Sequence, residues 1–136
     1  MLKLTSLSLE DAKRLIHAAE VKAATIGSPS NIAIVDAGGN LLAHVRMDGA
    51  QIASISHSIN KAFTSLACKL PTHVLGQDAQ PGGQFYGLSN TVEGRIITFA
   101  GGVPLRSGHE LVGAIGVSGG TAEQDREIAE AAKVAL

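Results

Sequence analysis

The segment NIAIVDAGGNLLAHVR, residues 31–46, contains the pattern that decides the fold. Residues 31–37 and 41–46 are rich in Ile, Val, Leu and Ala, which predicts two short β-strands. The residues between them, Gly38-Gly39-Asn40, are typical of a tight turn. Together they predict a β-hairpin, and a fold built from hairpins has a largely antiparallel sheet.

Amphipathic helices are expected before and after this hairpin in the sequence. Over residues 8–26 the apolar residues recur at helical spacing, and Ser8 with Asp11 forms an acidic variant of the capping box. A second helix is expected over residues 51–69, with Asp48 as its cap. Its apolar stripe consists of Ile52, Ile55, Ile59, Ala62, Phe63 and Leu66.

The second half of the chain begins with a segment, residues 70–93, that has no clean periodicity. It is rich in Gln, Gly, Ser and Asn, which predicts a long loop with one short helical turn near residues 72–76. Thr121 and Gln124 form a capping box that opens a last helix. The remaining elements expected are a strand at 95–100, a hairpin formed by 103–106 and 110–117, and the last helix at 121–135.

The resulting order is α-β-β-α-loop-β-β-β-α. This order predicts an α/β (α+β) fold in which helices cover a mostly antiparallel sheet of about five strands. The length of 136 residues fits one domain, residues 1–136, and a hydrophobic content of 45% is enough for a buried core.

Composition excludes several classes of protein. The net charge of −1 argues against a general nucleic-acid binder, which would carry a strong basic excess. A single cysteine, Cys68, excludes an intrachain disulfide and any multi-cysteine metal site. No apolar run is long enough to cross a membrane, and no signal peptide is evident, so we expect a cytoplasmic protein.

An ordered set of motifs runs along almost the whole chain. It comprises VDAGGNL at 35–41, RMDGA at 46–50, KAFT at 61–64, Pro71-Thr72, GGVPL at 101–105 and GAIGVSGG at 113–120, followed by Gln124-Asp125. Together these motifs resemble the GlcG/HbpS family, formerly DUF336. Relatives in that family include the C-terminal domain of PduO-type proteins and the OrfY proteins of diol-utilisation loci.

The resemblance implies a profilin-like sandwich, which agrees with the order of elements derived above. It also implies a homo-oligomer (dimer, tetramer or octamer), and several members of the family bind haem. Some relatives are linked to catabolic enzymes, so association with a bacterial microcompartment is a further expectation.

Three charged residues of the motifs are candidate ligand contacts. Arg46 could hold a carboxylate, such as a haem propionate, in a bidentate fork, with Lys61 as a second cation and Asp48 beside them. A purely structural interpretation is also open, in which Asp48 caps the second helix and Arg46 pairs with Asp48 or Asp36.

Two aromatic residues and the glycine runs complete the candidate site. Phe85 and Tyr86 lie on a glycine-flanked loop and could close over a flat ligand, or else plug the core or a subunit interface. Gly101 and Gly102 permit close approach of a ligand to the backbone. Ser118 belongs to a glycine run that either holds an anion at a helix N-terminus or only makes a tight turn.

The five histidines form no paired metal-binding motif, so a catalytic zinc site is not expected. A lone histidine can still be an axial ligand of haem iron, and His17 on the first helix is the candidate. The leading hypothesis is therefore a non-catalytic protein that binds haem or another anionic small molecule as an accessory or sensor component. The alternatives are an enzyme acting on a small organic acid in a catabolic pathway, or a structural accessory module of a diol- or glycolate-utilisation locus.

Overall fold

Both predicted hairpins are present in the computed structural model, which describes residues 1–136. The first consists of β1 (Asn31–Asp36) and β2 (Leu41–Arg46), and the second of β3 (Gly102–Ser107) and β4 (Glu110–Ser118). Because β1 also pairs with β4, the strands form one sheet in the order β2-β1-β4-β3, with every pair antiparallel. The prediction of an antiparallel α/β fold is confirmed.

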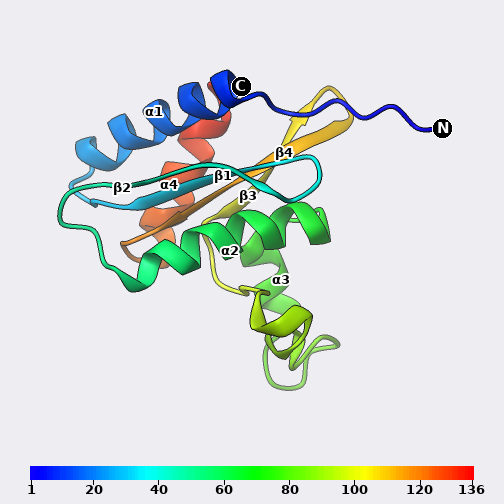
Figure 1. The fold of residues 1–136 in the computed structure, drawn as a ribbon. Helices are drawn as coiled ribbons and strands as arrows, with labels where there is room; N and C mark the ends of the chain where they lie inside the picture. The colour runs from blue at the N-terminus through cyan, green and yellow to red at the C-terminus, as the bar shows by residue number, and fades with distance from the viewer.

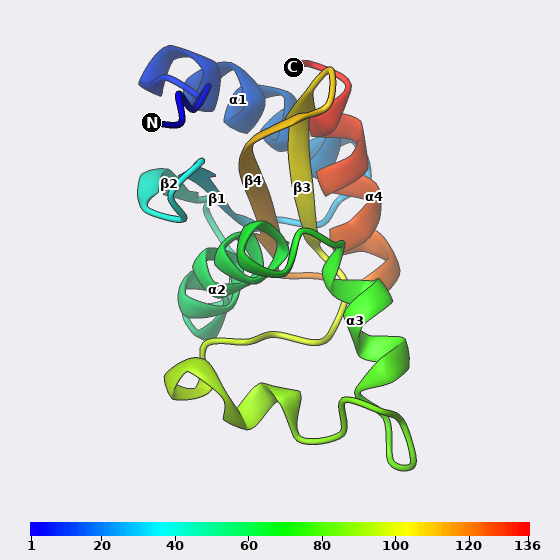
Figure 2. The same ribbon diagram turned by 90° about the vertical axis from the view of Figure 1, so that its right-hand side faces the viewer.

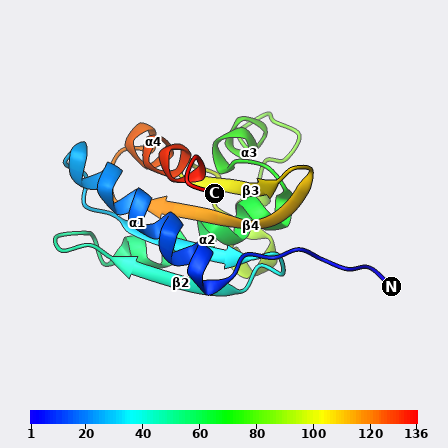
Figure 3. The same ribbon diagram turned by 90° about the horizontal axis from the view of Figure 1, so that it is seen from above.

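Helices cover both faces of this sheet. The first and last helices, α1 (Leu9–Thr25) and α4 (Ala122–Lys133), lie side by side on one face, and α2 (Ala53–Cys68) lies on the other (Figures 1 and 3). The capping boxes predicted at Ser8 and Thr121 are both formed. None of the helices has the length and apolar character needed to span a membrane.

The strand count is four, not five, because residues 95–100 do not join the sheet. The backbone of this segment bonds to a side chain of α2 instead. The Thr64 hydroxyl donates to the carbonyl of Arg95 and accepts from the N–H of Ile97. These hydrogen bonds hold the segment beside α2.

The expected loop at residues 70–93 contains more helix than the single turn predicted. A helix α3 (Thr72–Asp78) is followed by two short 3₁₀-helices, η1 (Leu88–Asn90) and η2 (Val92–Gly94). Residues 79–94, which we call the arm, project away from the sheet (Figure 2).

The two faces of the sheet differ in the size of their side chains. The face toward α1 and α4 carries the main core, with large residues such as Ile32, Ile34, Val103, Leu105, Ile115 and Val117. The face toward α2 is made of small residues, and a Cβ atom at Gly116 would collide with the backbone carbonyl of Ser58. The backbone of α2 therefore lies directly against the backbone of β4.

This close contact changes which side of α2 is buried. The buried positions of the helix are Ser54, Ser58, Lys61, Ala62, Thr64, Ser65 and Leu66. Of the predicted apolar stripe, only Ala62 and Leu66 are buried, while Ile55 and Ile59 are half-buried and Ile52 is 74% exposed. The stripe prediction is wrong for Ile52, whereas Ile59 packs against the buried Ala33, Val35 and Ala62. The closest contact with the glycines of β4 is made by small residues instead.

The fully buried side chain of Lys61 connects α2 to the opposite layer of the fold. Its Nζ donates to the carbonyl of Val117 and to Oδ2 of Asp125 on α4, each at 2.9 Å. Burial lowers the pKa of Lys61, while the carboxylate of Asp125 acts in the opposite direction. The other oxygen of Asp125 accepts the N–H of Gly120, so both charged groups have their hydrogen-bonding partners.

Two half-buried histidines each have one buried ring nitrogen without a hydrogen-bond partner. These atoms are Nε2 of His44 in β2 and Nδ1 of His73 in α3. Burial is the first cause that lowers the pKa of each histidine below its ordinary value of 6.5. For His73 the nearby Arg126 lowers the pKa further and Glu130 opposes it.

Replacing Lys61 with Met should reduce the free energy of unfolding by about 3–5 kcal/mol, because it leaves the buried carboxylate of Asp125 unpaired. Urea denaturation measures the change. Lys22→Met is the matched control, since Lys22 forms an exposed pair with Glu127 and its loss should cost less than about 1 kcal/mol. Equal costs for the two variants would show that the buried pair has no special role.

Stability should fall as the pH is lowered below about 6.5, the ordinary pKa of histidine. In that range the unfolded chain takes up protons that the folded His44 and His73 resist, so the free energy of unfolding decreases with acidification. Thermal scans at pH 7.5 and 5.5 should show a smaller drop in Tm for the double variant His44→Gln/His73→Gln than for the wild type. The exposed control His17→Gln should show the same drop as the wild type. A wild-type drop in the double variant would contradict this assignment.

Candidate functional site

The structure separates the residues that the sequence grouped into one site. Arg46 ends β2 on one edge of the sheet, whereas Gly101 and Gly102 lie at β3 on the opposite edge. Arg46 is exposed and forms no ion pair with Asp36 or Asp48. The purely structural interpretation of Arg46 is therefore wrong, and its guanidinium group remains free for a ligand.

Asp48 does not cap the second helix. That helix begins at Ala53, its N-cap position is Ile52, and no side chain caps it. Asp48 instead lies exposed in the turn between β2 and α2. Its carboxylate, like the guanidinium of Arg46, is at the surface.

Lys61 and Gly101 do meet, as the sequence predicted, but the cluster they form is closed. A Cβ atom at Gly101 would approach Lys61 Nζ within 2.9 Å and would collide with the carbonyl of Val117. The ring of Phe99 lies 4.9 Å from the same ammonium group. Glycine at position 101 therefore makes room for the buried ion pair, and the charge of Lys61 is neutralised within the protein.

The glycine run that precedes α4 is also occupied by the chain's own groups. Ser118 is buried and its hydroxyl bonds to the hydroxyl of Ser54. The N–H groups of Gly120, Thr121 and Gln124 bond to side chains of Asp125, Gln124 and Thr121. The tight-turn interpretation of this segment fits these bonds, because few N–H groups remain for an anion.

Phe85 and Tyr86 are exposed on the arm, at 46% and 70%. Phe85 lines an apolar pocket of about 280 Å³ whose other walls are Cys68, Leu70, Leu75 and Leu88. Burial raises the pKa of the Cys68 thiol, so it remains an uncharged, apolar wall rather than a thiolate. The pocket could take an apolar group, but neither Arg46 nor Lys61 lines it.

A second candidate ligand-binding surface lies on α1. His17 is exposed on this helix and has no hydrogen-bond partner among the side chains. Lys13 and Arg14, one turn before His17, and Val21, one turn after it, share its side of the helix because residues three and four apart are neighbours. Val21 is 54% exposed, so cationic, imidazole and apolar groups follow one another along the helix.

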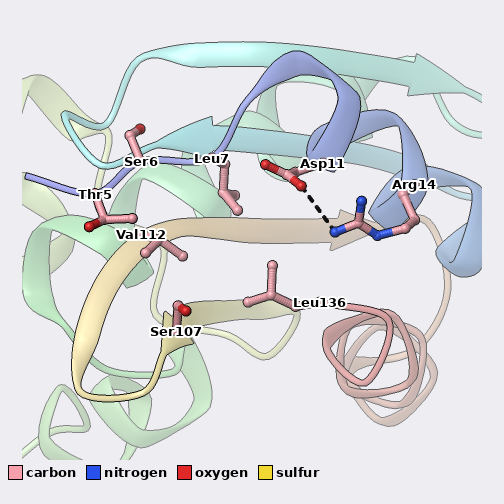
Figure 4. Close-up of a pocket in the computed structure, with 8 residues that line it drawn as sticks. All are labelled: Thr5, Ser6, Leu7, Asp11, Arg14, Ser107, Val112 and Leu136. Atoms are coloured by element: carbon pink, nitrogen blue, oxygen red, sulfur yellow. Dashed lines mark hydrogen bonds and ion pairs between the residues drawn. The ribbon is translucent and has the colours of Figure 1, made fainter.

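A pocket of about 260 Å³ lies at the start of this helix (Figure 4). Arg14 reaches into it and is held by Asp11, at 3.0 Å, and by the carbonyl of Ala135, at 3.1 Å. Hydrogen bonds from Ser8 and the ion pair with Arg14 lower the pKa of Asp11. The remaining walls of the pocket are Thr5, Ser6, Leu7, Ser107, Val112 and Leu136.

The sequence pointed to His17 but missed Arg14 and Asp11. The signal was present, since Arg14 precedes His17 by three residues on a helix whose cap had already been identified. No group of three or more His, Cys, Asp or Glu side chains is arranged to hold a metal ion. Iron at this surface would therefore have to arrive within a larger ligand that supplies most of its coordination.

Comparisons with curated proteins show close relatives. The chain is 42% identical, over 96% of its length, to a 15.0 kDa protein from the dhaT-dhaS intergenic region of Citrobacter freundii, and covers 92% of that protein. It is 40% identical, over 96% of its length, to the corrinoid adenosyltransferase PduO of the same organism, of which it spans only 39%. The similarity to PduO is thus to one part of that protein.

Comparison with solved structures shows the same fold. The ORFY protein of Klebsiella pneumoniae, assigned to DUF336, matches with a TM-score of 0.97 and 38% identity, covering 99% of this chain and 93% of that one. The PduOC:haem complex matches with a TM-score of 0.93 and 38% identity, covering 97% and 96%. The family model described as "Haem degrading protein HbpS-like" matches residues 7–133, and the chain therefore belongs to the HbpS-like family.

Proposed function

We propose that this protein binds haem, or an anionic small molecule of similar shape, as an accessory or sensor component. The observation that carries the proposal is the match, over 97% of the chain, to a relative whose structure was solved as a haem complex. The match to the HbpS-like family model over residues 7–133 supports it.

His17 is our candidate for the iron ligand. Its imidazole is exposed, so a ring system can approach it without rearrangement of the core. Lys13 provides a cation for one propionate, and Val21 provides apolar surface on the other side of the imidazole. Arg14 pairs with Asp11 but stays half exposed, so its guanidinium group can also bond to the second propionate. When bound, haem would supply redox or ligand-sensing chemistry at its iron, while this face of α1 would hold and orient it.

A haem at His17 would need a cover that one chain does not provide. Ligand sites commonly bury 70–90% of the ligand surface. The pockets of this chain measure about 260–350 Å³, and none of them includes His17. A second copy of the chain is the natural cover, which agrees with the homo-oligomer (dimer, tetramer or octamer) predicted from the family resemblance.

The alternative functions have less support. An enzyme acting on a small organic acid was predicted to use Arg46 and Lys61 as anchors, but the ammonium of Lys61 pairs with Asp125. Degradation of haem is a further candidate function, and the description of the matching family model supports it. A cytoplasmic location, with or without a microcompartment, stays a prediction.

Titration of the protein with haem should produce a Soret band that saturates at a fixed stoichiometry. His17→Ala should weaken binding at least tenfold, because the iron loses its protein ligand. His109→Ala, an exposed histidine in the turn between β3 and β4, is the control and should bind as the wild type does. Absence of saturable binding to the wild type would end the haem proposal.

Two further variants locate the ligand and separate binding from degradation. Arg46→Ala, measured in the same titration, should leave affinity unchanged; a loss there with none in His17→Ala would move the site to the end of β2. Incubation of the haem complex with a reductant and oxygen tests whether the bound porphyrin stays intact. A stable Soret band supports a haem-binding function. Decay of the band with release of iron would instead assign haem degradation to the protein.

A further inference from the structure

Five apolar side chains surround the pocket of about 280 Å³ between the arm and the helices α2 and α3. They are Cys68 at the end of α2, Leu70, Leu75 in α3, and Phe85 and Leu88 of the arm. None of the five belongs to either cluster of the hydrophobic core. The pocket is therefore a separate apolar region, and no charged side chain lines it.

Backbone hydrogen bonds fix the wall of the pocket that the arm provides. The arm runs from the end of α3 back beneath α2 (Figure 2). The N–H of Phe85 donates to the carbonyl of Asp78 at the end of α3, and the N–H of Leu88 donates to the carbonyl of Phe85, each at 2.9 Å. Glycine is required at position 83, because a Cβ atom there would collide with the same carbonyl of Asp78. The wall is thus preorganised, which reduces the entropy lost when a ligand binds.

The other end of the arm is a strained turn. Val92, Glu93 and Gly94 are consecutive residues with positive φ, at 50°, 56° and 74°. Glycine adopts this region freely, but a β-branched valine there is an outlier. The turn is held by the residue that follows it, since the guanidinium of Arg95 stacks on the ring of Phe63 in α2 at 3.6 Å. Strained segments gather at ligand clamps and switches, so this turn indicates a functional role for the arm.

The lining of the pocket decides the class of ligand. A charged group inside it would lose its water and meet no opposite charge, so a carboxylate is disfavoured. Burial raises the pKa of Cys68, so its thiol also stays uncharged. An apolar cavity of about 150 Å³ holds benzene, whereas drug-sized ligands occupy about 300–1,000 Å³. A pocket of about 280 Å³ therefore suits a small neutral molecule with one or two rings.

We propose that this pocket binds a small, uncharged, apolar molecule, and that the arm is its clamp. Phe85 keeps the ligand-covering role predicted for it, but without Arg46 and Lys61. The arm lies on the α2 side of the sheet, whereas His17 lies on α1 at the opposite face (Figure 1). The pocket is thus a second site, which does not depend on the haem proposal and differs from it in the charge of the ligand.

Cys68 provides a direct readout, because it is the only cysteine and it lines the pocket. Toluene and benzoate are matched probes that carry a methyl group and a carboxylate on the same ring. Saturating toluene should slow the alkylation of Cys68 by uncharged iodoacetamide about tenfold, because the ligand covers the thiol. Benzoate at the same concentration should leave the rate unchanged, and free cysteine should react equally in both solutions. Mass spectrometry measures the rates.

Three results of this experiment would overturn the proposal. The first is an equal rate with and without toluene, and the second is equal protection by benzoate. The third is protection that grows with protein concentration and not with toluene, which would assign the pocket to a second copy of the chain.

Two adjacent aromatic residues of the arm provide matched variants. Phe85 lines the pocket, whereas Tyr86, which is 70% exposed, does not. In calorimetric titration, Phe85→Ala should weaken toluene binding about tenfold through lost apolar contact, and Tyr86→Ala should bind as the wild type does. Thermal scans should give both variants the wild-type Tm, because both side chains lie at the surface. Equal toluene affinity in the two variants would overturn the proposal.

Haem titration of Phe85→Ala separates this site from the surface around His17. The variant should bind haem as the wild type does, because Phe85 is on the opposite side of the sheet from α1. A parallel loss of toluene and haem affinity would overturn the proposal of a second site.

Discussion

The ammonium group of Lys61 joins three parts of the molecule that lie far apart in the sequence. It extends from α2 past the end of β4 to Asp125 on α4, and therefore connects the two helical layers across the sheet. A buried charge is tolerated only when it is paired and hydrogen-bonded, and both conditions are met here. The residues around the pair follow from this requirement: glycine at position 101 leaves the space, and Gly120 donates to the carboxylate.

The same close packing explains why the buried side of α2 carries small residues. The helix lies against bare backbone at Gly116, which meets Ser58 and Ala62, and at Gly102, which meets the carbonyl of Lys61. This contact places Lys61 within reach of Asp125. The isoleucines of α2 lie off this contact, so Ile52 is exposed and Ile55 is half-buried. Close backbone packing and the buried ion pair therefore occur together on one side of the helix.

Local patterns were predictable from the sequence and non-local ones were not. Both hairpins and both capping boxes depend on residues within a few positions of one another, and the structure confirms them. The partner of Lys61 lies 64 residues away, so spacing could not reveal it, and the expectation of a free cation failed for that reason. The strand expected at 95–100 failed similarly, because the hydroxyl of Thr64 takes the backbone bonds that a sheet would have used.

The proposed ligand surface lies on the side of α1 that faces away from the core. The helix buries Ala12, Ala19 and Ala23 against the rest of the protein. His17 follows Ala12 by five residues, which places its side chain about 140° around the helix from that buried face. A ligand at His17 is therefore open to solvent on a single chain, and a second copy is the cover proposed above. Ligand binding and assembly at such a shared surface are thermodynamically linked, and each strengthens the other by the same factor.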